Sequence, residues 1–137
     1  MKVFIDTNVW VAAYVSQGLC RELLTYVRQR HDAVLSEQVL NEFAAALVKK
    51  AGESQAQASV EALVLRRHFP VLPAPARTGK FCRDPKDDAI VQAALDAGCD
   101  WLVSGDADLC VLKRVQGMPI STPRNFLQAL GVEEEWT

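Results

Sequence analysis

Acidic residues stand at the ends of several expected elements of this chain, and they are its main chemical feature. Asp6 follows the apolar run 3–5, and Asp106 follows the apolar run 101–103. Short apolar runs bounded by turn residues predict buried strands. Parallel strands bring their carboxyl ends to one edge of a sheet, which is where open α/β sheets bind ligands. We therefore expect the Asp6 and Asp106 side chains to lie close together.

A second pair of acids, Asp87 and Asp88, lies in the first turn of an expected helix. Residues 84–85 are Asp and Pro, a typical N-cap followed by a typical first helical residue. On a helical wheel Asp87 lies with Val91 and Ala94 on the apolar side, while Asp88 is about 100° away. We therefore expect Asp87 to face the site, with Asp88 further out at its edge. The alternative role of both acids is compensation of the helix dipole.

Glu42 adds a fourth acid from a different expected helix. Ser36 is a suitable N-cap for that helix, and Lys49 and Lys50 close it. Glu42 lies near the edge of the apolar stripe, neither in the core nor far outside it. Four carboxylates that converge on one edge repel each other, so their pKa values rise or the site is destabilised unless cations are present.

Oxygen ligands of this kind suit Mg²⁺ or Mn²⁺ better than zinc. The sequence shows no pattern that pairs a nucleophilic Ser or Cys with His, so hydrolysis by metal-activated water is the chemistry that the acids favour. Asn8 and Ser104 are polar neighbours of the acids that could orient carboxylates or water. Hydrogen bonding within turns is the commoner role of these residue types.

Basic residues recur every three positions through one expected long loop and its end. They are Arg77, Lys80, Arg83 and Lys86. One interpretation is a solvated loop, and the other is a patch that steers phosphate groups toward the acids. The sequence leaves both open.

The composition favours a globular protein of one domain covering residues 1–137. The chain is 50% hydrophobic and 23% charged, and its 137 residues suffice for a real core. No apolar run approaches membrane-spanning length, and no leader precedes the first expected strand, which predicts a cytoplasmic protein without a membrane partner. The net charge of −2 argues weakly against a general nucleic-acid coating protein. It does not exclude a nuclease, because acids that hold a cation lower the net charge.

The cysteines do not suggest a zinc site. None of the four forms a C-x-x-C pair, and both histidines are distant from them in sequence. We expect reduced thiols that pack as small apolar residues. The residues concerned are Cys20, Cys82, Cys99, Cys110, His31 and His68.

Expected strands and helices alternate along the chain, which predicts an α/β fold with a mostly parallel sheet. A polar tail, residues 133–137, follows the last helix. The expected strands are 3–5, 33–35, 69–72, 101–103 and 119–120, and the expected helices are 9–15, 19–30, 37–50, 54–68, 85–97 and 123–130, with a short helix after 108.

Taken in order, these features resemble the PIN-domain ribonucleases, the family that includes VapC-type toxins of bacterial toxin–antitoxin pairs. The resemblance covers nearly the whole chain and rests on residues 4–8, Glu42, 84–88 and 102–109. It implies a three-layer α/β/α sandwich around a parallel sheet. It also implies an acidic metal site that consists of Asp6, Glu42, Asp87 and Asp106.

Spacing alone leaves the third acid of the family pattern ambiguous. Asp87 lies 19 residues before Asp106 and Asp88 lies 18 before it, and family members differ by a residue here. Ala94 and Gly98 fit the pattern better with Asp87. A further acid, Asp108, resembles one that is often found near the site.

The resemblance implies a divalent-metal-dependent ribonuclease, the toxin of a toxin–antitoxin pair, that uses Mg²⁺ or Mn²⁺. It also implies an RNA substrate, a homodimer, and an antitoxin whose C-terminal segment enters the acidic groove.

Two alternatives belong to other classes. The first is a catalytically silent PIN-like module that binds RNA or protein, against which the presence of all four acids argues. The second is a receiver domain, which needs an acceptor Asp on a middle strand and a Lys after a later one. Here Asp6 follows the first strand, and Asp106 stands where that Lys would be expected.

Overall fold

The apolar runs of the sequence form the centre of a six-stranded sheet in the computed structural model, which describes residues 1–132. β1 (Lys2–Ile5) lies between β2 (Asp32–Ser36) and β4 (Trp101–Val103) and is parallel to both. Residues 3–5 have no exposed surface, because they lie on a central strand with helices over both faces of the sheet.

The remaining strands extend the sheet on both sides of this centre. The order is β3-β2-β1-β4-β6-β5, and every pair is parallel except β5 with β6. The predicted α/β class and mostly parallel sheet are therefore confirmed. The outer strands are β3 (Val71–Leu72), β5 (Arg114–Val115) and β6 (Met118–Ser121).

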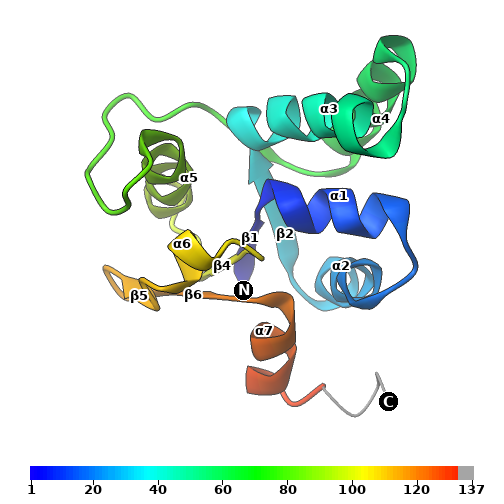
Figure 1. Ribbon diagram of the computed structural model, residues 1–137. Coiled ribbons are helices and arrows are strands. Elements are labelled where there is room, and N and C mark those ends of the chain that lie inside the picture. The colour runs from blue at the N-terminus through cyan, green and yellow to red at the C-terminus, as the bar shows by residue number, and fades with distance from the viewer. Residues whose placement is uncertain (133–137) are drawn as a thin grey trace.

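Seven helices surround the sheet within residues 1–132. Figure 1 shows α1 and α2 on one side of the strands and α5 on the other, with α3 and α4 packed together above α1. This arrangement confirms the three-layer α/β/α sandwich. The helices are α1 (Thr7–Val15), α2 (Leu19–Arg30), α3 (Glu37–Ala51), α4 (Gln55–His68), α5 (Pro85–Asp96), α6 (Ala107–Cys110) and α7 (Pro123–Ala129).

The strand order creates a crevice at the carboxyl edge of the sheet. From β1 the chain moves outward to β2 and β3, and it then returns to place β4 on the other side of β1. At such a switch point the connections leave in opposite directions, which opens a crevice outside the carboxyl ends of the two strands. Asp6 directly follows β1 at this crevice, and Asp106 lies three residues after the end of β4.

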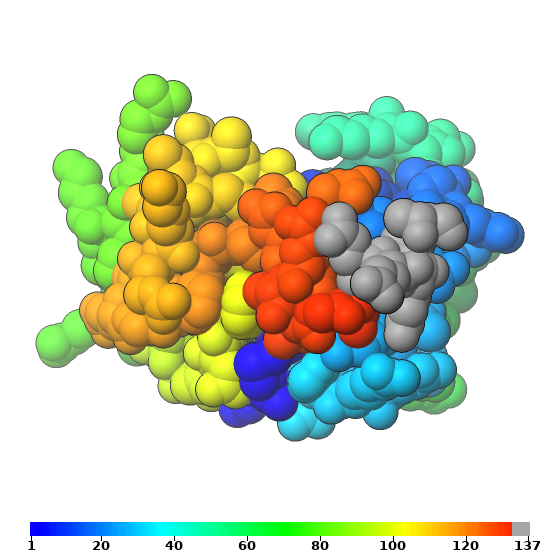
Figure 2. All heavy atoms as spheres, turned by 90° about the horizontal axis from the view of Figure 1, so that it is seen from below, coloured from blue at the N-terminus to red at the C-terminus, as the bar shows by residue number. Residues whose placement is uncertain are grey.

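The last helix of the described chain packs beside α2 and the start of β4. Figure 2 shows α7 in red next to the first residues of the chain and α2. Phe126 and Leu127 of α7 are buried there, and the Phe126 ring meets Trp101 edge to face at 5.1 Å. No helix within the described residues is long and apolar enough to cross a membrane.

The prediction of a strand over residues 69–72 was partly wrong. Phe69 instead ends α4, and its ring packs edge to face with Trp10 at 4.9 Å. Pro70 follows without a backbone N–H, so regular pairing begins only at β3. The predicted polar tail, residues 133–137, lies outside the described residues.

The sequence analysis missed β5 and the hairpin that joins it to β6. The turn residues Gln116 and Gly117 both have positive φ, 48° and 84°, as a two-residue hairpin turn requires. A two-residue strand is too short for a periodic pattern, and Gln-Gly is a weaker turn signal than Asn-Gly.

The hairpin gives a test of the fold. Gly117→Ala should destabilise the protein by about 1 kcal/mol, because a Cβ is unfavourable at positive φ. Gln116→Asn should raise the stability, because Asn tolerates this conformation better than Gln. Urea unfolding of both variants and the wild type checks this, and equal midpoints for the wild type and Gly117→Ala would contradict the hairpin.

Candidate functional site

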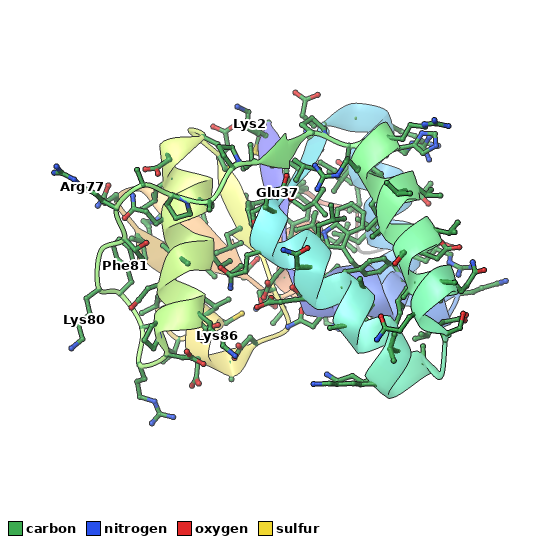
Figure 3. The ribbon with its side chains drawn as sticks, turned by 90° about the horizontal axis from the view of Figure 1, so that it is seen from above. Lys2, Glu37, Arg77, Lys80, Phe81 and Lys86 are labelled. Carbon is green, nitrogen blue, oxygen red and sulfur yellow. The ribbon has the colours of Figure 1, made fainter. Side chains whose placement is uncertain are left out.

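All four acids predicted from the sequence line one cleft at the carboxyl edge of the sheet. The cleft has a volume of about 950 Å³ and runs along α1 and α3. Figure 3 shows α5 and α3 on either side of the central strands, with side chains gathered between the two helices. The four acids are Asp6, Glu42, Asp87 and Asp106, each from a different part of the chain.

Asp6 is the most enclosed of these acids, with only 6% of its surface exposed. Its backbone N–H donates to Val103, which ties it to the end of β4. Its Oδ1 accepts from the N–H of Thr7 at 2.8 Å, so Asp6 also caps α1. Burial raises the pKa of Asp6, and the repulsion from nearby carboxylates adds to this despite the opposing hydrogen bonds.

Ser104 connects two of the acids. Its hydroxyl donates to Asp6 Oδ2 at 2.7 Å and accepts from the N–H of Asp106 at 3.0 Å. Ser104 is fully buried, so this hydroxyl orients the Asp6 carboxylate, one of the two roles considered for it. Asn8 has the other role: its Oδ1 accepts from the N–H of Gly105 at 2.9 Å, which fixes the turn.

Both carboxylate oxygens of Glu42 are held in place. Thr7 Oγ1 donates to Oε1 at 2.7 Å, and Gln38 Nε2 donates to Oε2 at 3.1 Å. The sequence analysis missed both donors. Thr7 adjoins Asp6, and Gln38 lies four residues before Glu42 on the same helix, so helical spacing was a signal for Gln38.

Asp87 is half-buried in the first turn of α5 and receives no hydrogen bond within residues 1–132. Burial raises its pKa to about 6, and repulsion from Asp106, Asp84, Asp6 and Asp108 adds to the effect. A carboxylate without hydrogen-bond donors and with several acids nearby is destabilised by repulsion in its charged form. A cation at this position would relieve that repulsion.

Asp88 points away from the cleft. It is 6% exposed, and its Oδ1 accepts from the N–H groups of Phe81 at 2.7 Å and Cys82 at 2.6 Å. These bonds lower its pKa, so it is a stable carboxylate that shapes the loop before α5. The expectation that Asp88 lies at the edge of the site was therefore wrong, because the loop supplies two donors that the helical wheel does not include.

Asp106 and Asp108 follow β4 in different orientations. Asp106 Oδ1 accepts from the N–H of Asp108 at 2.9 Å, so Asp106 lines the cleft and caps α6. The Asp108 side chain is 51% exposed and lies 3.9 Å from Arg83 Nη2. Asp108 is not among the residues that line the cleft.

The predicted basic loop stands beside the cleft rather than in it. Arg77 and Lys80 project outward from the loop before α5, and Lys86 lies nearer to α3 (Figure 3). The Arg83 side chain is 90% exposed. Lys50, in the last turn of α3, does line the cleft, although its position at a helix end suggested only a dipole interaction.

The cleft fits a hard divalent cation in the chemistry of its donors. Four carboxylates line it, and burial and mutual repulsion raise the pKa of Asp6 and Asp87. Within residues 1–132, however, no three His, Cys, Asp or Glu side chains are placed to hold one ion together. To share one ion, the carboxylate groups would have to turn toward each other.

The chain belongs to the PIN domain family. The sequence profile of that family matches residues 2–108, which include all four acids that line the cleft. Among curated proteins, none matches the sequence significantly.

Several solved structures share the fold. A chain of VapBC2 from Rickettsia felis, solved with a DNA fragment from its promoter, is 15% identical and has a TM-score of 0.67, with 89% of this chain and 98% of that chain covered. Mycobacterium tuberculosis VapC20, described as a toxin that cleaves the sarcin-ricin loop, is 18% identical with a TM-score of 0.62. The match covers 85% of this chain and 99% of that chain. The PIN domain endonuclease Utp24 is 22% identical with a TM-score of 0.51, and the match covers 88% of this chain and 84% of that chain. At these identities the likeness concerns the fold alone.

The raised pKa of Asp87 gives a testable dependence of stability on pH. The folded protein binds this proton more tightly than the unfolded chain, whose carboxyl has a pKa near 3.8. The acid therefore costs no stability below pH 3.8 and an increasing amount as the pH rises through 6. In EDTA at pH 7.5, Asp87→Asn should be more stable than the wild type by about 1 kcal/mol after allowance for solvent screening.

Urea unfolding at pH 7.5 and pH 4 measures this difference, which should shrink at the lower pH. The matched control is Asp32→Asn, which removes an exposed carboxylate at the start of β2, away from the cleft. A loss of stability in Asp87→Asn at pH 7.5 would contradict the clustered-acid description.

Proposed function

We propose that this protein is a divalent-metal-dependent endoribonuclease and the toxin of a toxin–antitoxin pair. The observation that carries the proposal is the set of four carboxylates on one cleft, at the switch point of a PIN-domain sheet. Its residues are Asp6, Glu42, Asp87 and Asp106.

These four carboxylates would hold Mg²⁺ or Mn²⁺, the cations that oxygen ligands prefer. When bound, such an ion lowers the pKa of water and stabilises the negative charge that develops on a phosphodiester. The four carboxylates repel a polyanionic substrate. Among the described residues that line the cleft, Lys50 is the one basic side chain that could offset this repulsion. A site of this charge would therefore depend on a metal to accept RNA.

The other polar residues of the cleft have positioning roles in this proposal. The Ser104 hydroxyl holds Asp6 Oδ2 and the backbone of Asp106. Thr7 holds Glu42 from α1. Because partners of this kind fix the direction of ligand oxygens, they restrict how far the carboxylates can turn away from a bound ion.

The structural neighbours support the biological part of the proposal. VapC20 is described as a toxin that cleaves the sarcin-ricin loop, Utp24 as a PIN domain endonuclease, and VapBC2 as bound to a DNA fragment from its promoter. By analogy we propose an RNA substrate, an antitoxin protein as partner, and a homodimer. We also propose that residues 1–137 form a single nuclease domain and that the protein acts in the cytoplasm.

Cleavage of total bacterial RNA tests the activity. The wild type should produce discrete fragments with Mg²⁺ or Mn²⁺ and none with EDTA. Asp6→Asn and Asp87→Asn should lower the rate by roughly 100-fold or more, because even residues that only support metal ligands contribute 10–100-fold. Asp32→Asn serves as the control and should cleave as the wild type does.

Fragments that persist in EDTA would disprove the metal requirement. If the wild type binds RNA or protein but cleaves nothing with either metal, the catalytically silent module is the correct description.

The basic loop is tested by the salt dependence of RNA binding in the Asp6→Asn background. Replacing Arg77, Lys80 and Arg83 by Ala should reduce the slope of log K against log [salt] by roughly 2, since each phosphate contact of a single strand contributes about 0.7. The control replaces three exposed residues elsewhere, Arg30, Arg67 and Arg124. Equal slopes for both triple variants would show that the basic loop makes no phosphate contacts with the RNA.

A further inference from the structure

We infer that Gln38 is a positioning residue that sets the placement of Glu42 and Asp87 on opposite sides of the cleft. The inference rests on the proposed function, because it concerns the same carboxylates. It adds a residue that is neither acidic nor a lining residue of the cleft, and that joins two helices across its mouth.

The Gln38 side-chain amide makes two hydrogen bonds in different directions. Nε2 donates to Glu42 Oε2 at 3.1 Å within α3, and to the backbone oxygen of Lys86 at 3.0 Å in the first turn of α5. An amide nitrogen carries two hydrogens, so both donors are used. The opposite orientation of the amide would place its oxygen against two acceptors, which excludes it chemically.

The bond to Lys86 matters because few hydrogen bonds tie this part of the chain to the rest of the described structure. Residues 73–84 form a long loop before α5, and the bonds of Asp88 and Gln92 to that loop are local. Within residues 1–132, the Gln38 bond is the one hydrogen bond that joins stretch 73–92 to any element other than α5. The contact of Arg83 with Asp108 is long and exposed.

Asp87 follows Lys86 directly, so its position depends on this bond. The apolar side chains Ile90 and Val91 anchor the body of α5 in the core, but Asp87 lies before them in the first turn and receives no hydrogen bond itself. Figure 3 labels Glu37, the residue before Gln38 at the start of α3, and Lys86, whose backbone oxygen accepts the Gln38 bond at the start of α5. Gln38 therefore fixes the separation of the two helix starts that carry Glu42 and Asp87.

Loss of Gln38 should release both carboxylates at once. Glu42 would keep only Thr7 as a donor, and the first turn of α5 would lose its tie to α3. Removal of such supporting partners lowers metal affinity by about 10–100-fold. The chain offers a matched control in α4: Gln57 Nε2 donates to Glu61 Oε1 at 3.0 Å with the same spacing of four residues, away from the cleft.

The test compares Mn²⁺ binding by isothermal titration calorimetry for the wild type, Gln38→Ala, Gln38→Met and Gln57→Ala. Gln38→Met keeps the length of the side chain without its donors. Both Gln38 variants should bind Mn²⁺ about 10-fold more weakly. With RNA, kcat should fall while KM changes little, and Gln57→Ala should match the wild type in both assays.

Unfolding temperatures in EDTA separate positioning from a general structural role. The unfolding temperature of Gln38→Met should lie only a few degrees below that of Gln57→Ala, because Gln38→Met loses one more exposed hydrogen bond, the one to Lys86. Equal Mn²⁺ affinity in Gln38→Met and Gln57→Ala, with binding intact in the wild type, would overturn this inference alone. A wild type that binds no Mn²⁺ would overturn the proposed function and this inference together.

Discussion

Repulsion among carboxylates at the edge of a buried parallel sheet is the constraint on which the rest of this structure depends. Asp6 is almost completely enclosed, and Asp87 receives no hydrogen bond from any residue of the described range 1–132. Burial and neighbouring acids raise the pKa of both. Hydrogen-bond donors reduce the free-energy cost of this repulsion. The Ser104 hydroxyl and the N–H of Thr7 donate to Asp6, and the N–H of Asp108 donates to Asp106. A cation among these carboxylates would offset their mutual repulsion, as the proposed function requires.

The same interactions connect local structure to the site. Asp6 and Asp106 each end the segment after a strand and begin a helix, so the residues that line the cleft also fix where α1 and α6 start. Glu42 is held from both sides by Thr7 and Gln38, which belong to different helices. The fold therefore positions the carboxylates through bonds that belong to its own helix starts and helix contacts.

Much of this arrangement was predictable from the sequence because it depends on local patterns. The apolar runs ending in Asp6 and before Asp106 predicted central strands, and helical spacing favoured Asp87 over Asp88 as the acid that faces the cleft. The sequence did not reveal β5, which is too short for a periodic signal, and it predicted β3 two residues too long, because Phe69 ends α4 and Pro70 has no N–H to pair.

The sequence by itself determined the α/β class, the sheet edge at which the acids gather, and the types of ligand atom available there. These follow from hydrophobic periodicity and from helix-start residues, which act over a few positions of the chain. Only the tertiary structure decided that Asp88 turns to the loop, that Asn8 fixes a turn while Ser104 orients Asp6, and that Gln38 reaches Lys86 across the cleft. The physical reason is that each of these choices depends on a donor or acceptor supplied by another segment, whose distance in space no local pattern encodes.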